Sequence, residues 1–446
     1  LIDNYFGDSF SIIHILPFLA STSDGGFAVS SYEELDPKFG NWENLFSISK
    51  DRILMADLVL NHVSSSHPWV QKFRQSTEPE SSYILSPSQN GKWDNVTRPR
   101  NSSLFTSLLT VNGNKDVWTT FGPDQIDLNW KEPAVLIEFL KVIKNYFKYG
   151  ITWLRLDAVG FIWKESKTTC LHLDSAHKIV RILRMLLMKI NRSAILITET
   201  NVPQKENLSY LQSGEEAHLA YNFPLPPLLL ECLFSNKADL INQWLFNWPE
   251  TDINSGFINF TASHDGIGLR ALEGFMDSKR FTQLLVSCEK RGGLISHRKM
   301  PNGDEHPYEL NISWWSAMAD NGRDSSLYQM ERFLLSQIFV MSLKGIPAFY
   351  FQALMGSEND IKTFSRTGQR RDLNREKFDA KTLNFALQDP NSIASKNLKS
   401  IKHAIDVRRK IDAFHPDQPM SCLSKNRRDV VIIRRGQGDN VVWALH

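Results

Sequence analysis

The sequence contains no hydrophobic run long enough to cross a membrane. A membrane helix needs roughly 18 apolar residues, and the candidate at residues 223–234 is short and interrupted by three prolines. The chain also has little excess charge, because its formal net charge is only +2. This balance gives no electrostatic reason to expect a nucleic acid or a membrane surface as a partner. A membrane protein and a nucleic-acid-binding protein are therefore both disfavoured.

Cysteine is scarce, with four residues in 446 and no CxxC pair. The scattered positions, Cys170, Cys232, Cys288 and Cys422, argue against a metal-binding motif and predict free buried thiols in a reducing compartment, hence a cytoplasmic protein. The chain begins with leucine, so a targeting segment upstream would be invisible. Hydrophobic residues make up 42% and charged residues 22%, as in ordinary globular proteins. The length suits a barrel of about 250–400 residues with insertions or a second domain.

Short apolar runs alternate with longer helical patterns along the chain. The runs are continuous rather than alternating, which is typical of parallel strands covered on both faces. Helical spacing of apolar residues recurs between them, and polar residues follow the strand ends. These repeated units predict an α/β protein with a (β/α)8 TIM barrel. The expected strands are 11–19, 52–60, 151–156, 194–198, 256–261 and 345–351, and the expected helices include 132–149 and 169–190.

Two connections are too long for plain barrel loops. Residues 64–124 are rich in Ser, Asn, Pro and Arg, and residues 266–325 are rich in glycine and charge. Loops of this length are uncommon unless they are functional, so both are expected to build a cleft on a catalytic barrel of residues 1–414. From residue 415 to 446 the pattern changes to alternation, which predicts the start of a separate, truncated C-terminal β domain.

Charged and polar residues stand where the predicted strands end. Asp57 and Asn61-His62 end one strand, and three later ends follow: Arg155-Leu156-Asp157, Glu199, and His264-Asp265. In a barrel the carboxyl ends of all strands open on one face, so these groups should converge. Neighbouring acids push their pKa values apart, which favours one ionised nucleophile and one protonated acid.

Each of these residues also has a structural interpretation. A strand-end aspartate often caps the helix that follows. Arg155 and Asp157 lie on one side of a strand and would suit a structural ion pair. His264 alone is more typical of a satisfied structural histidine. The combination, in this order and on this architecture, favours a catalytic site.

Four segments resemble the signature regions of the α-amylase superfamily, glycoside hydrolase family thirteen. They are ADLVLNH (56–62), WLRLDAVGF (153–161), ITETNVP (197–203) and FTASHDG (260–266), and QIDLN (125–129) resembles an additional region. The resemblance implies a retaining enzyme whose nucleophile and acid/base lie about 5–5.5 Å apart. It assigns these roles to Asp157 and Glu199, with Asp265 as the third acid. Arg155 would orient the nucleophile, and His62 and His264 would bind the sugar.

Further segments resemble the sucrose phosphorylase group of this superfamily. HILPF followed by SDGGF implies that Asp24 and Phe27 hold the glucosyl ring. In RRDLNRE, Arg375 would pair with Asp24 and close the pocket behind the sugar. Phosphate as acceptor needs positive charge, for which Arg98 and Arg100 in TRPR are candidates, as is the loop 296–299; each charge would equally suit a solvated loop. In HPYELN, Tyr308 aligns with an acceptor-loop tyrosine.

The resemblance also ranks the possible activities. Sucrose phosphorylases tend to have glutamine where Glu309 stands, and ETNVP and HPYELN look closer to glucosylglycerate phosphorylases. Glucosylglycerate is therefore the first expected donor, and sucrose or sucrose 6′-phosphate the second. An α-glucosidase or transglucosidase of the same fold stays open, as does a non-catalytic sugar-binding relative, which the three retained acids disfavour. The expected partners are a small glucoside and phosphate as co-substrate, without cofactor or metal; the oligomeric state stays open. The family's first barrel strand is expected to be missing.

Overall fold

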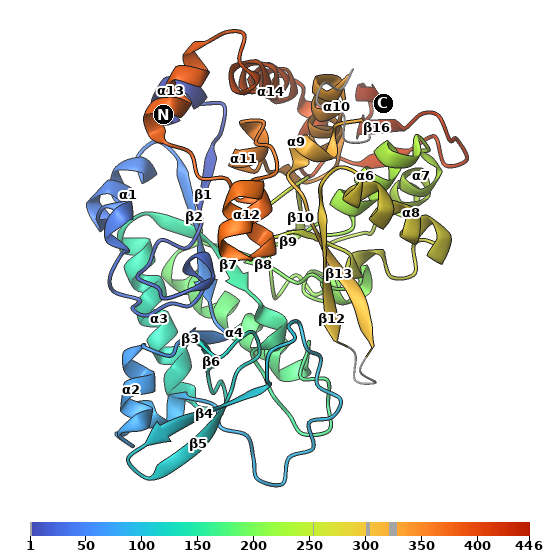
Figure 1. Cartoon of the computed structure of the whole chain (residues 1–446). Coiled ribbons are helices and arrows are strands. Elements are labelled where there is room, and N and C mark those ends of the chain that lie inside the picture. The colour runs from blue at the N-terminus through green and yellow to red at the C-terminus, as the bar shows by residue number, and fades with distance from the viewer. Residues whose placement is uncertain (1, 253, 300–303, 321–327) are drawn as a thin grey trace.

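A parallel sheet forms the centre of the molecule in a computed structural model that describes residues 2–252, 254–299, 304–320 and 328–446. The strands follow one another in space in the order of the chain, and all neighbouring pairs are parallel. The sheet curls into a partial barrel with helices outside it (Figure 1). Its seven strands are β1 (Ile12–Ile15), β2 (Ile53–Val59), β7 (Ile151–Asp157), β8 (Ile195–Thr198), β9 (Leu219–Tyr221), β10 (Gly256–Asn259) and β14 (Ile346–Pro347).

Each of the six expected strands has a counterpart in this sheet, although most are shorter than predicted, and the run 11–19 is strand only at Ile12–Ile15. Of the run 345–351, only Ile346–Pro347 is strand, and helix α11 (Phe351–Leu354) begins directly afterwards. The run 256–261 ends as a strand at Asn259. The sequence analysis missed β9, whose three residues are too few to give a periodic signal. Within the described residues, the curled parallel sheet has seven strands.

Amphipathic helices cover the outside of the sheet. Helix α3 (Pro133–Lys148) begins with a proline in its first turn, and Glu132 caps it by accepting a hydrogen bond from the Ala134 amide. Its apolar face is buried against β7 and the core, and α4 (Asp174–Ile190) buries a similar stripe. Further helices include α6 (Leu225–Ser235), α7 (Asp239–Phe246), α10 (Gln329–Ser342), α13 (Ala380–Gln388) and α14 (Ile393–Arg409).

Both long connections have their own secondary structure. The first leaves and returns through β3 (His62–Ser64) and β6 (Gln125–Asp127), which pair with each other, and it contains α2 (Pro68–Arg74) and the hairpin β4 (Phe105–Thr110)–β5 (Gly113–Trp118) at the lower left of Figure 1. The second contains β11 (Ile267–Gly268), α8 (Ser278–Glu289), the hairpin β12 (Leu294–Lys299)–β13 (Glu305–Asn311) and α9 (Trp314–Ala317). Residues 300–303 and 321–325 of this second connection lie outside the described residues.

The C-terminal segment forms an antiparallel sheet, as its alternating pattern predicts. Its strands are β15 (Met420–Cys422), β16 (Ile432–Gln437) and β17 (Asn440–Leu445). The sheet shares a core with the helices beside it, because buried Arg435 donates to the Leu343 and Ser342 carbonyls after α10. Among the described residues, the four cysteines are free and no helix is both long and apolar enough to span a bilayer.

Candidate active site

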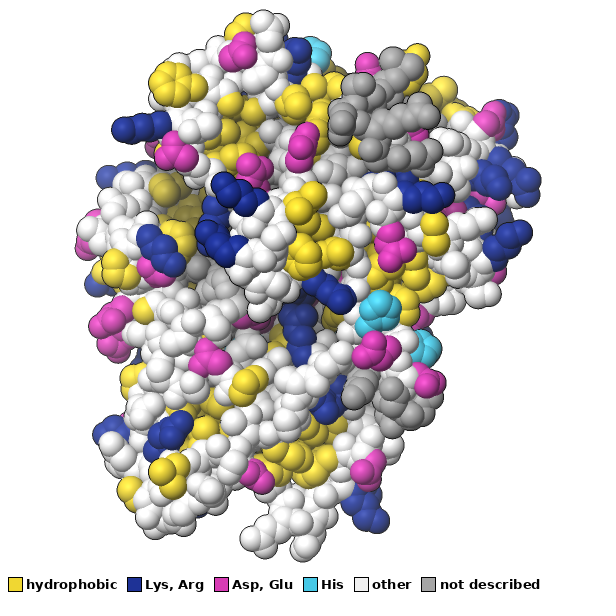
Figure 2. Space-filling view, in the orientation of Figure 1, with side chains coloured by type: hydrophobic (Ala, Val, Ile, Leu, Met, Phe, Trp, Pro, Cys, Tyr) yellow, Lys and Arg dark blue, Asp and Glu magenta, His cyan; other side chains and the backbone are white. Residues whose placement is uncertain are grey.

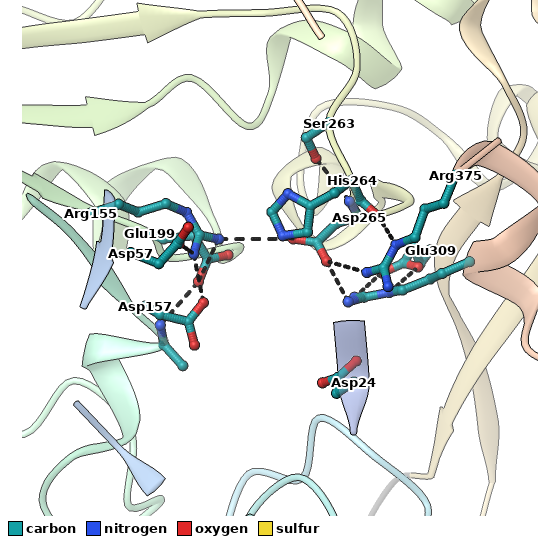
Figure 3. Close-up of polar contacts among 12 residues, drawn as sticks. Asp24, Asp57, Arg155, Asp157, Glu199, Ser263, His264, Asp265, Glu309 and Arg375 are labelled. Atoms are coloured by element: carbon teal, nitrogen blue, oxygen red, sulfur yellow. Dashed lines mark hydrogen bonds and ion pairs between the residues drawn. The ribbon is translucent and has the colours of Figure 1, made fainter. Parts of the chain in front are cut away.

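One buried arginine lies at the centre of the acidic cluster. Arg155, on β7, is only 3% exposed, and its Nη1 lies 2.5 Å from Asp57 Oδ1 and 2.6 Å from Asp157 Oδ1. Its Nη2 lies 3.8 Å from Glu199 Oε2 and 3.9 Å from Asp265 Oδ2 (Figure 3). The structure therefore brings the predicted acids together around the guanidinium of Arg155.

The side chain of Glu199 is tied to the backbone next to Asp157. Glu199 follows β8, the neighbour of β7, and its Oε2 accepts a hydrogen bond of 3.1 Å from the Ala158 amide. Ala158 has a φ of 49°, in the left-handed region, where it directly follows Asp157. Asp157 and Glu199 both line the same cleft, so the carboxyl groups open onto one site.

The electrostatics of the two carboxyls favour a division of protonation states. Burial raises the pKa of Asp157 and of Glu199, neighbouring carboxylates raise both further, and Arg155 opposes the rise. Two such groups side by side do not both ionise readily, so they tend to retain a proton between them. Arg155 contacts Asp157 directly but lies 3.8 Å from Glu199, and this difference favours the charge on Asp157 and the proton on Glu199 over the reverse arrangement.

Asp265 is held ionised by a second arginine, which the sequence analysis did not select. Arg371 Nη1 pairs with Asp265, while its Nη2 and Nε lie 2.7 Å and 3.1 Å from the carboxylate of Glu309. Burial alone would raise the pKa of Asp265, but Arg371 and further cations lower it well below the usual range. Glu309 also has a lowered pKa, because Arg371 outweighs its burial.

The expected pair between Asp24 and Arg375 does not form. Arg375 donates from Nε to the His264 carbonyl at 2.5 Å, and its Nη2 lies 3.8 Å from Asp265 Oδ1. Asp24 instead accepts a hydrogen bond of 3.2 Å from Gln125 Nε2. Figure 3 shows no contact between the carboxylate of Asp24 and the side chain of Arg375.

The position of Arg375 has a physical reason in the turn after Asp24. Gly25 has a φ of 65°, and a side chain there would begin 3.1 Å from Arg375 Nη1. Arg375 therefore packs against backbone, and it does not line the cleft. Arg371 lines the cleft together with Asp24, and the charge of Asp24 contributes to the raised pKa of Arg371.

Two histidines and one phenylalanine form the remaining predicted wall. Phe27 stacks on His264 with ring centroids 5.1 Å apart, and the Arg155 guanidinium lies 5.7 Å from the same phenylalanine ring. His62 Nε2 lies 3.2 Å from the Phe27 carbonyl and 3.0 Å from Gln125 Nε2. Burial lowers the pKa of both histidines, that of His264 to about 4, so both are neutral hydrogen-bonding groups near pH 7.

The cleft encloses about 820 Å³ of empty space, including its open mouth. Lys and Arg side chains lie near the centre of the face shown in Figure 2. Arg155, Glu309 and Arg375 lie behind the walls rather than in them. The predicted residues that line the cleft are Asp24, Phe27, His62, Arg98, Arg100, Asp157, Glu199, His264, Asp265 and Tyr308; those that the sequence analysis did not assign include Phe121, Phe161, His172, Asn201, Arg270 and Arg371.

A buried lysine contacts several oxygen atoms beside the first insertion. The side-chain Oδ1 of Asn61 accepts a hydrogen bond of 2.9 Å from Lys164 Nζ. The same ammonium lies 2.8 Å from Asp127 Oδ2 and donates to the Phe161 carbonyl. Lys164 and Asp127 are both buried, so a fixed positive charge neutralises this carboxylate.

Lys164→Met is expected to destabilise the fold, because it leaves the buried Asp127 carboxylate without its counter-charge. Removing one partner of a buried ion pair reduces the free energy of unfolding by about 3–5 kcal/mol. Urea denaturation of the wild type and the variant measures the loss. Lys141→Met, which removes a largely exposed partner of Glu138, is the matched control and should change stability by less than about 1 kcal/mol. Equal stability of Lys164→Met and wild type would contradict the structural role of this lysine.

Comparison with known proteins agrees with this fold and site. A family model for the α-amylase catalytic domain matches residues 9–266. The structure superposes on the crystal structure of a sucrose 6F-phosphate phosphorylase from Thermoanaerobacter thermosaccharolyticum with a TM-score of 0.86, at 23% sequence identity and with 100% of this chain and 88% of that chain covered. The chain therefore belongs to the α-amylase family, and the predicted (β/α)8 fold class is confirmed.

Within the family, the proteins similar to this chain include glucosylglycerate phosphorylases. A glucosylglycerate phosphorylase from Allomeiothermus silvanus is 40% identical over 435 residues, which is 97% of this chain and 78% of that protein. A glucosylglycerate phosphorylase from Escherichia coli is 33% identical, over 98% of this chain and 78% of that protein. The predicted resemblance to the sucrose and glucosylglycerate phosphorylase group is thus confirmed.

Proposed function

We propose that this protein is a retaining α-glucoside phosphorylase that converts 2-O-α-glucosylglycerate and phosphate into α-glucose 1-phosphate and glycerate. The observation that carries the proposal is the pairing of Asp157 and Glu199 across one cleft that arginines also line. The two carboxyl groups support double displacement at a glucosyl carbon. The arginines support an anionic acceptor. The 40% identical relative, a glucosylglycerate phosphorylase, supports the choice of donor.

The reaction has two displacements. In the first, a carboxylate oxygen of Asp157 attacks the anomeric carbon, the bond from this carbon to the glycerate oxygen breaks, and Glu199 gives its proton to that oxygen. The product is a β-glucosyl ester of Asp157. In the second, a phosphate oxygen attacks the same carbon, the ester bond breaks, and the proton on the attacking oxygen passes to Glu199. The two inversions restore the α configuration.

The remaining residues bind and orient the sugar. Arg155 holds the leaving carboxylate of Asp157 in place through its 2.6 Å contact. Asp265, kept ionised by Arg371, is suited to accept hydrogen bonds from sugar hydroxyls, which strengthen as positive charge develops on the ring. His62, His264 and Phe27 form the wall around the same ring.

Phosphate needs a cationic place near the anomeric carbon, and the first insertion supplies it. Arg98 and Arg100 both line the cleft, and buried Nε and Nη2 of Arg98 have no hydrogen-bond partner among the described residues. Arg100 lies near Tyr308 and Glu309, since its charge opposes the rise that burial gives the pKa of Tyr308 and adds to the lowering of the pKa of Glu309. A buried donor without a partner is unfavourable unless a ligand satisfies it. We therefore assign phosphate to the part of the cleft that Arg98 and Arg100 line. We propose no cofactor besides this co-substrate, and we propose a cytoplasmic location for the enzyme.

The deciding experiment is incubation of the protein with glucosylglycerate, sucrose and sucrose 6′-phosphate, each with and without phosphate. We expect α-glucose 1-phosphate to form from glucosylglycerate, and to form from it faster than from the other two donors. Free glucose as the sole product, formed equally without phosphate, would identify an α-glucosidase instead. Turnover of sucrose 6′-phosphate ahead of glucosylglycerate would place the protein with the phosphorylase whose structure it matches at 23% identity.

The pH profile of kcat/KM should be bell-shaped and displaced to higher pH than an ordinary carboxyl pair would give. Burial raises the pKa of Glu199, so its acidic form persists above the usual value of about 4.3 and the rate falls only when pH rises through the raised pKa. Asp157 must be ionised, and its raised pKa moves the acid limb upward as well. Initial rates from pH 4 to 9 measure both limbs. A flat profile across this range would contradict the assignment of Glu199 as the acid.

A further inference from the structure

Two arginines of the second insertion form a separate cationic pair at the cleft. Arg270 follows β11 and Arg298 lies on β12, and both side chains line the cleft while being only 12% and 14% exposed. They share one acid, because Glu273 Oε1 lies 3.0 Å from Arg298 Nη2 and 3.8 Å from Arg270 Nε. One half-exposed carboxylate between two guanidinium groups leaves the pair with a net positive charge.

This pair has unused hydrogen-bonding capacity. The Nε atoms of Arg270 and of Arg298 are buried and have no hydrogen-bond partner among the described residues. Burial lowers the pKa of Arg298, and the positive charge of Arg270 lowers it further. The two guanidinium groups therefore lie close to each other. Two partly desolvated like charges with open donors are unfavourable in isolation. An anionic ligand between them would relieve both problems.

An amide from the acid/base loop adds an acceptor to the same wall. Asn201, two residues after Glu199, lines the cleft, and its buried Oδ1 has no hydrogen-bond partner in the part of the chain that the structure describes. Its amide packs on Gly268 of β11, where any side chain would begin 2.2 Å from Asn201 Nδ2. Glycine at this position thus brings the Asn201 amide next to the strand that leads to Arg270.

The arginine pair comes from the second insertion, whereas the proposed phosphate cations Arg98 and Arg100 come from the first. Arg270 is close enough to His172 to lower the pKa of that imidazole, after burial and His177. Tyr308 lies close to both groups, because Arg100 opposes the rise that burial gives its pKa and Tyr308 in turn acts on the pKa of Arg298. Two anions take part in the proposed reaction, and the cleft offers two groups of arginines.

We propose that Arg270 and Arg298 bind the carboxylate of the departing hydroxy acid, and that Asn201 accepts a hydrogen bond from its hydroxyl group. The inference rests on the proposed function for the identity of the leaving group. The planar fork of a guanidinium matches a carboxylate through two parallel hydrogen bonds, which suits this assignment. These residues then determine donor specificity: they select a glucoside whose aglycone carries a carboxylate, and a neutral aglycone leaves the arginines unsatisfied.

The test compares two donors in Arg270→Gln and Arg298→Gln. The first donor is glucosylglycerate, and the second is α-glucosyl fluoride, which carries the same sugar and no carboxylate. We expect the ratio of kcat/KM for glucosylglycerate to that for the fluoride, both with phosphate, to fall roughly 10–100-fold, the range of a charged hydrogen bond. Arg298→Lys, which keeps the charge and loses the fork, should fall between. Arg427→Gln, an exposed arginine paired with Asp429, is the control.

Titration calorimetry with glycerate and with glycerol supplies a readout that does not need turnover. The wild type should bind glycerate and not glycerol, and each glutamine variant should bind glycerate at least 10-fold more weakly while melting at the wild-type temperature. An equal loss with both donors, or a raised KM for phosphate with the fluoride donor, would overturn the assignment and give these arginines to phosphate. Unchanged glycerate binding would overturn it as well. Failure of the proposed function differs from both, because the wild type would then form no α-glucose 1-phosphate from glucosylglycerate.

Discussion

Asp157→Asn is expected to lower kcat for phosphorolysis by roughly 10⁴-fold or more, because an amide cannot form the glucosyl ester on which both displacements depend. The substitution keeps the size and shape of the side chain. Arg155 retains its 2.5 Å contact with Asp57, so the guanidinium does not lose its main partner. Release of α-glucose 1-phosphate from glucosylglycerate measures the rate. The loss should be equal with α-glucosyl fluoride, because every donor requires the nucleophile.

The same variant should fold as stably as the wild type, or more stably, at pH 7. Burial raises the pKa of Asp157 above its value in the unfolded chain, so keeping this group ionised in the folded state is unfavourable at any pH above the unfolded value. A neutral asparagine removes that penalty. Thermal melting at pH 7 measures the effect, with exposed Asp116→Asn as the control for replacing a carboxylate. A variant that folds normally and turns over at the wild-type rate would refute the nucleophile assignment.

The central strands could be predicted from the sequence because strands that are buried on both faces consist mostly of apolar residues. Parallel strands covered on both faces read as continuous apolar runs, and the acids follow the ends of those runs, so the convergence of Asp157, Glu199 and Asp265 follows from the barrel topology. β9 gave no such signal, since three residues, of which only one is fully buried, are too few to form a recognisable apolar run. The short strand β14 was overestimated because the apolar residues after Pro347 continue the run while the backbone turns into α11.

The choice between Arg371 and Arg375 could not be made from the sequence. The two arginines lie four residues apart across the 3-10 helix Arg370–Asn374, and only the path of that turn decides which guanidinium enters the cleft. Arg371 reaches Asp265 and Glu309, while Arg375 is directed to the backbone beside Gly25. Arg270 and Asn201 were missed for a related reason, because their significance depends on the contact between the second insertion and the loop after β8. Such contacts carry no periodic signal.

Glu199→Gln is the second large effect that we expect, and it depends on the donor. Glutamine cannot protonate the departing glycerate oxygen, so kcat/KM for glucosylglycerate should fall by roughly 10³-fold, within the usual range for general acid catalysis. Fluoride leaves as a stable anion with far less need of a proton. The variant should therefore keep much more of its activity with α-glucosyl fluoride and phosphate, and the alkaline limb of the pH profile should disappear.

The comparison of the two variants separates the roles of the two carboxyls more sharply than either variant alone. Loss of the nucleophile is independent of the donor, whereas loss of the acid is rescued by a leaving group that needs no proton. The Glu199→Gln side chain can still accept the hydrogen bond from the Ala158 amide, so the wall beside Asp157 should persist. If α-glucosyl fluoride turned over as slowly as glucosylglycerate in this variant, Glu199 would be acting on the sugar or on Asp157 rather than as the proton donor. Phosphate can still attack the glucosyl ester in this variant, because an oxygen of phosphate that is already ionised has no proton to pass to residue 199.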